Sequence, residues 1–211
     1  MAFASEPRLV VLNGLRLKGL CDGPPLAAAT SLDEADAARI LDDLESDGLV
    51  TRRPGPRSGW ALTTSGRAEH ARLMEQEADE AADRAAIEEA YGRFRQVNDD
   101  LLRACTDWQL RPEGGDAVVN DHADEAYDRK VVDRLEAVDD AAQPVCRALA
   151  ERRERFAAYG PRLAAALAKV EAGDGEWFTK PLIDSYHTVW FELHEDLLLS
   201  LAIERTKEEQ A

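Results

Sequence analysis

The chain has 211 residues, of which 45% are hydrophobic and 32% charged, so it can form one large domain or two small ones around a buried core. With 26 Lys and Arg against 42 Asp and Glu, its formal net charge of −16 disfavours attraction of the whole chain to nucleic acid or anionic membranes. The three cysteines are widely spaced, and the sequence has neither a basic and apolar leader nor an apolar run near the roughly 20 residues of a membrane span. These features predict a cytoplasmic protein with no membrane segment.

The negative charge is concentrated in the second part of the sequence. Residues 1–74 carry a net charge of −1, whereas residues 75–211 carry −15. Gly, Pro and Thr are frequent in 48–66 but rare in the long stretch that follows. Because charge and composition change near the same place, we predict two domains, 1–74 and 75–211.

The first domain reads as three helices and a hairpin. Leucine and valine from Leu9 to Leu20 recur at helical spacing, and a short helix is expected from Pro25 through Ala29. The hydroxyls of Thr30 and Ser31 are expected to cap a third helix, which ends at Gly48. Its expected buried stripe is Ala38, Leu41 and Leu44. Two strands, Leu49 to Arg53 and Trp60 to Thr63, then flank a turn-rich basic tip at 54–59.

Two motifs in this domain are similar to those of a known group of proteins. Leu41 to Arg53 reads L-x-x-L-E-x-x-G-L-V-x-R-R, and Leu62 to Arg67 reads L-T-x-x-G-R. Together they resemble the recognition helix, wing and exit of MarR-type and PadR-type winged-helix regulators, over about residues 7–74. The resemblance implies double-stranded DNA binding by a homodimer, with the third helix in the major groove and the wing along the backbone or minor groove.

The residue chemistry offers contacts for DNA and also an objection to them. Guanidinium groups on and beside the wing can pair with phosphates, and Arg39 on the third helix can contact guanine. The predicted DNA-binding residues are Arg39, Arg52, Arg53, Arg57 and Ser58. However, the third helix begins Asp33-Glu-Ala-Asp36, and carboxylates near phosphates weaken binding. The alternative is therefore a winged helix that docks a protein and does not bind DNA.

The second domain is expected to be all-helical. One helix is predicted from Arg67 to Trp108, with a loop at Arg111–Asp116 after it. Further helices are expected at about 122–138, 144–159, 161–172 and 180–208, with Pro144 and Pro161 in first turns. Acidic runs at 77–83 and 121–128 are interpreted as solvated helix faces. The predicted fold is thus mainly α, with an N-terminal winged helix-turn-helix carrying a two-stranded wing, followed by an all-helical C-terminal domain.

The aromatic and polar residues of the second domain allow a small-molecule site. They are Asn98, Trp108, His122, Tyr186, His187, Trp190 and His194, and they can equally pack an Ala-rich core. The net acidity favours a neutral or cationic ligand, although Arg152, Arg153 and Arg155 offer local positive charge. His187 and His194 are seven residues apart, about 10 Å by helical rise, so core histidines are favoured over a metal site.

No motif supports an enzyme: the sequence lacks a Gly-rich phosphate loop, a G-x-S-x-G elbow and an HExxH helix. No cofactor or metal is expected. The leading hypothesis is a cytoplasmic, homodimeric DNA-binding transcriptional regulator that responds to a small-molecule effector. The alternative is a winged-helix protein-interaction module.

Overall fold

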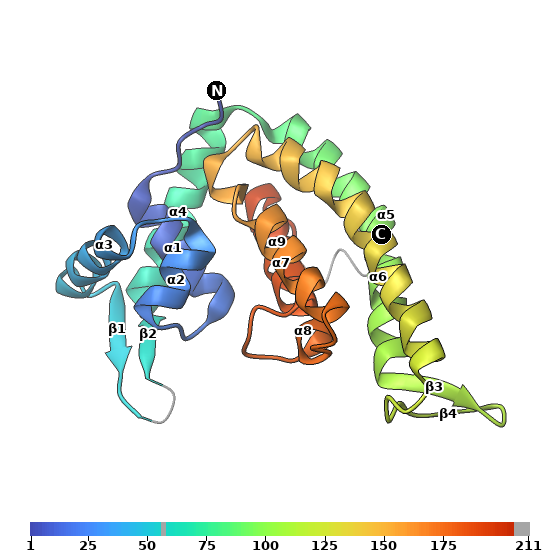
Figure 1. The fold of residues 1–211 in the computed structure, drawn as a ribbon. Helices are drawn as coiled ribbons and strands as arrows, with labels where there is room; N and C mark the ends of the chain where they lie inside the picture. The colour runs from blue at the N-terminus through green and yellow to red at the C-terminus, as the bar shows by residue number, and fades with distance from the viewer. Residues whose placement is uncertain (56–57, 205–211) are drawn as a thin grey trace. The chain divides into compact units, whose positions relative to one another are not determined.

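The computed structural model describes residues 1–55 and 58–204, and this part of the chain is mainly helical (Figure 1). Two small antiparallel sheets, each of two strands, accompany the helices. The residues form two compact units. Unit 1 contains 1–88, 149–158 and the described residues from Glu192 on, and unit 2 contains 89–148 and 159–191.

Unit 1 begins with three helices, a hairpin and a fourth helix, which share one core. The elements are α1 (Pro7–Lys18), α2 (Gly23–Thr30), α3 (Glu34–Ser46), β1 (Val50–Arg53), β2 (Gly59–Leu62) and α4 (Thr64–Ala81). α1 contacts α2, α3, α4 and β2, and its leucine and valine side chains from Leu9 to Leu15 are buried. The core residues are Leu9, Val11, Leu12, Leu15, Cys21, Leu26, Ile40, Leu41, Leu44, Val50, Trp60, Leu62, Leu73 and Met74.

Backbone contacts fix the hairpin against this core. β1 and β2 pair with Val50 opposite Leu62 and Arg53 opposite Gly59. Cys21 adds a short bridge, since its N–H donates to the Trp60 carbonyl at 3.1 Å and its own carbonyl accepts from Trp60 N–H at 2.8 Å. At Gly66 the α4 backbone passes so close to β1 that an added Cβ would lie 1.9 Å from the preceding Leu49 carbonyl oxygen.

The start and the buried face of α3 differ from the sequence prediction. Asp33 caps the helix by accepting from Ala35 N–H at 2.8 Å, whereas the Thr30 hydroxyl donates back to the Leu26 carbonyl of α2. A carboxylate cap suits the positive end of the helix dipole and displaces the predicted hydroxyl. The buried stripe contains Ala37 instead of Ala38, which is exposed, together with Ile40, Leu41 and Leu44. Gly48 ends the segment at a φ of 73°, as predicted.

The predicted long helix from Arg67 to Trp108 is wrong, because it is two helices. α4 ends at Ala81, Ala82 takes a left-handed φ of 48°, and α5 runs over Arg84–Gln109. The Asp83 carbonyl accepts from Ala86 and Ile87, so the residue opens the new helix. Its carboxylate binds Arg153 from a distant part of the chain, a contact that periodicity does not reveal.

Unit 2 contains most of α5 and α6 (Glu125–Ala150), with α7 (Tyr159–Glu171) and α8 (Glu176–Thr179). α9 (Tyr186–Leu201) lies in unit 2 up to Phe191 and in unit 1 from Glu192 on. A short 3-10 turn, η1 (Glu154–Phe156), belongs to unit 1. Pro161 lies in the first turn of α7, as predicted, and Gly173 follows the end of the helix at a φ of 94°.

Two features of unit 2 correct the sequence analysis. The segment predicted as a loop forms a hairpin of β3 (Leu110–Glu113) and β4 (Asp116–Val119), so the C-terminal region is not all-helical. Gly114 and Gly115 both have positive φ and supply the tight turn that such a hairpin needs. Pro144 lies inside α6 and does not begin a helix. α6 therefore continues through a residue that lacks a backbone N–H.

Candidate functional site

The hairpin β1–β2 carries the basic residues that the sequence singles out. Arg52 and Arg53 are exposed, and the Arg52 guanidinium carbon lies 5.9 Å from the centre of the Trp60 ring. Ser58 is exposed directly before the second strand, while Arg57 lies outside the described residues. Arg52 and Arg53 therefore present positive charge to solvent beside α3.

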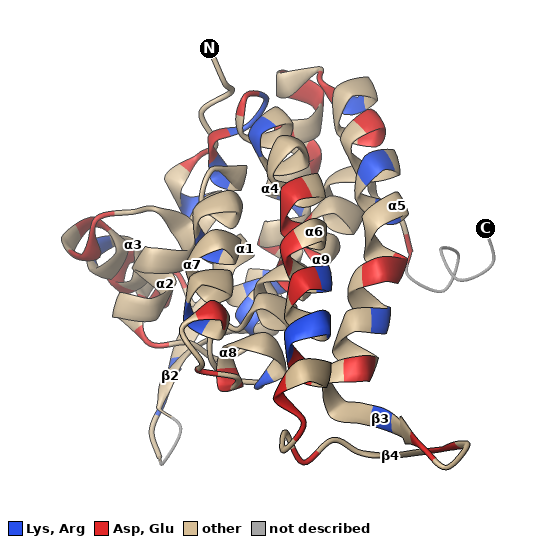
Figure 2. Cartoon of the chain, turned by 45° about the vertical axis from the view of Figure 1, so that its right-hand side comes forward, with Lys and Arg blue, Asp and Glu red and all other residues tan. Residues whose placement is uncertain are grey.

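The exposed face of α3 is acidic, as the red segments of that helix indicate (Figure 2). The exposed acids on and beside it are Asp33, Glu34, Asp36, Asp42, Asp43, Glu45 and Asp47. Arg39 is exposed among them, with nitrogens 3.3 Å from an Asp36 oxygen and 3.7 Å from an Asp43 oxygen. These ion pairs engage the guanidinium that was predicted to contact a base, so α3 offers little free positive charge.

The starts of α2 and α3 also lack the features of an anion site. The N–H groups at a helix start commonly hold phosphate oxygens. In α2 the first turn contains Pro24 and Pro25, which have no N–H, after the carboxylate of Asp22. In α3 the Asp33 carboxylate occupies the Ala35 N–H. Neither helix start therefore favours a DNA phosphate.

A groove of about 510 Å³ lies between α2, α3 and the hairpin. We call it the hairpin groove. It is lined by Asp22, Gly23, Pro24, Pro25, Ala38, Leu41, Asp42, Arg52 and Trp60. Its size falls in the ordinary range of small-molecule sites, and Arg52 belongs both to this groove and to the basic hairpin.

The ligand-binding residues predicted in the second domain fall into separate clusters. In the first, the Trp190 indole N–H donates to the Asn98 carbonyl oxygen at 3.0 Å, and the Trp190 ring stacks on Phe94 at 4.5 Å between centres. The Tyr186 hydroxyl donates to an Asp139 oxygen at 3.0 Å. Burial raises the pKa of Tyr186, and the Asp139 charge raises it further. Tyr186 and Trp190 are buried, and the polar group of each is already bonded to another side chain of the protein.

The second cluster joins the end of α5 to the residues after β4. The Trp108 ring stacks on Phe178 at 4.7 Å and lies 4.5 Å from the His122 ring, between centres. His122 has a left-handed φ of 59°, and its Nδ1 lies 2.9 Å from an Asp128 oxygen. The buried Asn120 side chain donates to Asp128 at 2.7 Å and to the Trp108 carbonyl at 3.2 Å. This network orders the residues after the hairpin.

The other two histidines predicted to bind a ligand lie in different units. His187 is half-buried in unit 2, and burial lowers its pKa. His194 is half-buried in the part of α9 that belongs to unit 1. Within residues 1–55 and 58–204, no group of three or more His, Cys, Asp or Glu side chains is arranged to hold a metal ion.

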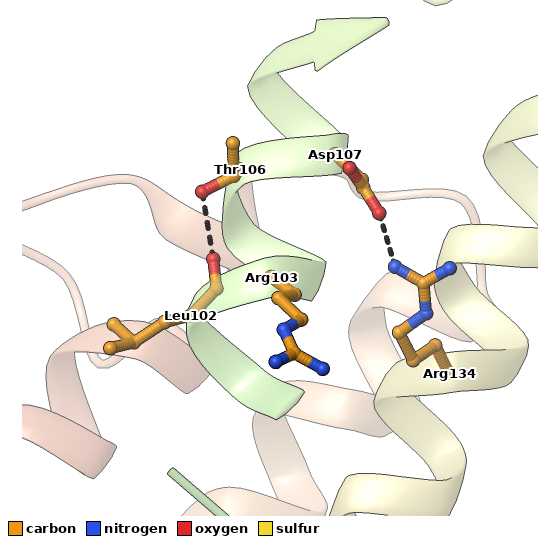
Figure 3. A pocket seen from close by; sticks show the side chains of 5 residues that line it. All are labelled: Leu102, Arg103, Thr106, Asp107 and Arg134. Carbon is orange, nitrogen blue, oxygen red and sulfur yellow. Dashed lines mark hydrogen bonds and ion pairs between the residues drawn. The ribbon is translucent and has the colours of Figure 1, made fainter. Parts of the chain in front are cut away.

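A second hollow, of about 330 Å³, opens between α5 and α6 in unit 2 (Figure 3). Leu102, Arg103, Thr106, Asp107 and Arg134 line it. Arg134 forms an ion pair with Asp107, and Arg103 lies 3.7 Å from an Asp100 oxygen. Since both guanidinium groups have carboxylate partners, the hollow has little positive charge with which to hold an anion.

A buried ionic network in unit 1 was missed by the sequence analysis. Arg153 binds Glu77 at 2.8 Å and Asp83 at 2.6 Å, and Arg155 binds Glu77 at 2.8 Å and also Asp196. All five side chains are at most 9% exposed. Glu77 and Asp83 are therefore not part of a solvated face, and the two arginines are not available to a ligand. A pairing between residues more than 40 positions apart leaves no local pattern.

Two opposing effects act on the pKa of Glu77: its burial, and the charges and hydrogen bonds of its partners. Burial raises the pKa of Glu77, but the charges of Arg155 and Arg153 and a hydrogen bond from Ser5 lower it by more. The net pKa lies below the ordinary value. Glu77 is therefore a charged, fully partnered residue that holds three segments of unit 1 together.

Comparison with protein-family models, with curated proteins and with solved structures finds no match for this chain. Among the helices of the described residues, none has both the length and the apolar character needed to cross a membrane.

Proposed function

We propose that the chain is a DNA-binding transcriptional regulator, acting as a homodimer, and that residues 1–74 form its winged helix-turn-helix. One observation carries the proposal: α2 and α3, joined by a short turn, share a core with a hairpin that exposes Arg52 and Arg53. This arrangement is typical of a helix pair that approaches the major groove while a wing contacts the backbone. The first sequence motif covers the second half of α3 and β1, and the second runs from the end of β2 into the start of α4.

The distribution of charge favours binding led by the wing. Arg52 and Arg53 can neutralise phosphates, whereas the exposed acids of α3 repel them. Arg39 becomes available to a base only if it leaves Asp36 and Asp43. We therefore expect a large contribution from phosphate contacts and little sequence discrimination by α3.

The test is fluorescence anisotropy of a labelled duplex with the full chain, from about 50 to about 200 mM salt. Replacing Arg52 and Arg53 with Ala removes two phosphate contacts and lowers the log–log salt slope by about 1.8. The control is Arg95→Ala/Arg147→Ala, which removes the same charge from two exposed positions in unit 2. Equal losses in both variants, or an unchanged slope, would contradict binding by the wing.

The acidic surface of α3 favours a second candidate, a module that docks a basic protein surface. Asp36→Asn/Asp43→Asn distinguishes the two, because it removes two charges and releases Arg39. A DNA-binding protein then binds duplex more tightly, by several-fold at low salt, than the control Asp79→Asn/Asp99→Asn. If neither variant nor the parent chain binds duplex at low salt, the regulator hypothesis is wrong and the docking module is favoured.

A further inference from the structure

We propose that the hairpin groove binds a small organic cation with a flat apolar body, and that the bound cation strengthens DNA binding. The binding part of this inference stands on the groove itself. The effect on DNA rests on the proposed function.

The floor of the groove suits a flat apolar body. Leu41 and Trp60 belong to the core of unit 1 and reach the groove with Pro24 and Pro25 beside them. The face of an indole ring attracts cations, and guanidinium groups stack on it well. The Arg52 guanidinium already lies 5.9 Å from the centre of the Trp60 ring, so the chain places a cation of its own at this ring.

The charge of the groove favours a cation over an anion. Asp22 comes from the start of α2 and Asp42 from α3, and both line the groove with Arg52. Within the described part of the chain, neither aspartate side chain has a hydrogen-bond or ion-pair partner. Two carboxylates against one guanidinium leave a negative balance. An amidinium or ammonium group gains from both carboxylates, whereas an anion is repelled.

Arg52 connects the groove to the proposed DNA surface. A cation that stacks on Trp60 takes the place of the Arg52 guanidinium, which is then free to contact a phosphate. The same cation offsets the charge of Asp42 on α3. Both changes favour DNA binding. Because coupling between two binding sites is reciprocal, bound DNA must in turn strengthen binding of the cation.

The binding test compares three probes of one shape and different charge: benzamidine, benzamide and benzoate. Nitrogen–proton correlation spectra of the full chain follow the Trp60 indole N–H, identified with the variant Trp60→Phe. We expect benzamidine to shift this signal saturably, and benzamide and benzoate to bind at least fivefold more weakly. Asp22→Asn/Asp42→Asn should weaken benzamidine at least fivefold, and the charge-matched control Asp79→Asn/Asp99→Asn should leave it unchanged. Equal binding of the three probes, or an equal loss in both variants, would overturn the assignment of the groove.

The coupling test measures duplex affinity by anisotropy with and without saturating benzamidine. We expect affinity to rise two- to fivefold, and the rise to disappear in Asp22→Asn/Asp42→Asn. Benzamidine binding with no change in duplex affinity overturns the coupling. If the chain binds no duplex in either condition while benzamidine still depends on the two aspartates, the proposed function fails and the groove assignment stands.

Discussion

His70 makes the stability of the protein depend on pH in a way that can be calculated. It lies on α4 with only 3% of its surface exposed, and its Nε2 is 3.0 Å from the Asn13 side-chain oxygen. Burial lowers the pKa of His70 to about 4, against the opposing charge of Asp196 and with help from Arg16 and Arg155. The folded protein therefore holds His70 neutral, with Nε2–H donating to Asn13.

The sign follows from where the proton binds. Between a pKa of about 4 in the folded state and about 6.5 in the unfolded state, the unfolded chain binds the extra proton. The free energy of unfolding therefore falls as pH falls through this window. At about 1.4 kcal/mol per unit, His70 alone accounts for a loss of about 2 kcal/mol between pH 7 and pH 5.

The assay is urea unfolding followed by circular dichroism at pH 5, 6 and 7, with His70→Gln as the test variant. Gln keeps a donor for Asn13 but does not titrate, so we expect the fall in stability of this variant to be about 2 kcal/mol smaller. His122→Gln, at a side chain that is 43% exposed, serves as the control. A ring proton of His70 that titrates with a pKa near 6.5, or identical pH slopes for His70→Gln and the parent chain, would refute the reasoning.

Three further predictions concern unit 1, and one of them is compared with a control position on α5. Arg155→Met leaves buried carboxylates without their partner and should lower the free energy of unfolding, measured in urea, by about 3–5 kcal/mol. Adding Asp196→Asn should restore part of this loss, and simple additivity of the two changes would argue against the ion pair. Gly66→Ala should destabilise the protein by about 1–3 kcal/mol, because the added Cβ clashes with backbone. Gly92→Ala, which has open space on α5, should stabilise it by about 0.5–1 kcal/mol. Equal effects of the two variants in thermal unfolding would contradict the close approach of the backbone at Gly66. Ala82→Gly should raise stability by about 1 kcal/mol because it relieves a left-handed residue, and a lower melting temperature would contradict that conformation.

Local signals in the sequence predicted much of unit 1. Leucine spacing, Gly48 and the turn-rich segment at 54–59 located α1, α3 and the hairpin, because each depends on residues near one another in the chain. Within residues 1–62, the predictions for α3 erred by one residue in the buried stripe and in the residue that caps the helix.

For the candidate site, the sequence located the basic hairpin but not the groove beside it. Arg39 lies where periodicity placed it, on the exposed face of α3, and its pairing with Asp36 and Asp43 follows from helical spacing. The hairpin groove was not predicted, since it needs Asp22, Asp42 and Trp60 from three elements to meet. The sequence indicated Trp60 only as a residue of the second strand of the hairpin.

The sequence by itself determined the mainly helical class, the position of the hairpin and the acidity of α3, because these depend on local spacing and composition. Only the tertiary structure decided which charges are buried. Glu77 and Asp83 look like a solvated acidic run until Arg153 and Arg155, some 70 residues later, are placed against them. The break at Ala82 comes directly before Asp83, which takes part in this contact. A buried charge is stable only beside its partner, and long-range pairing has no period that a sequence pattern can reveal.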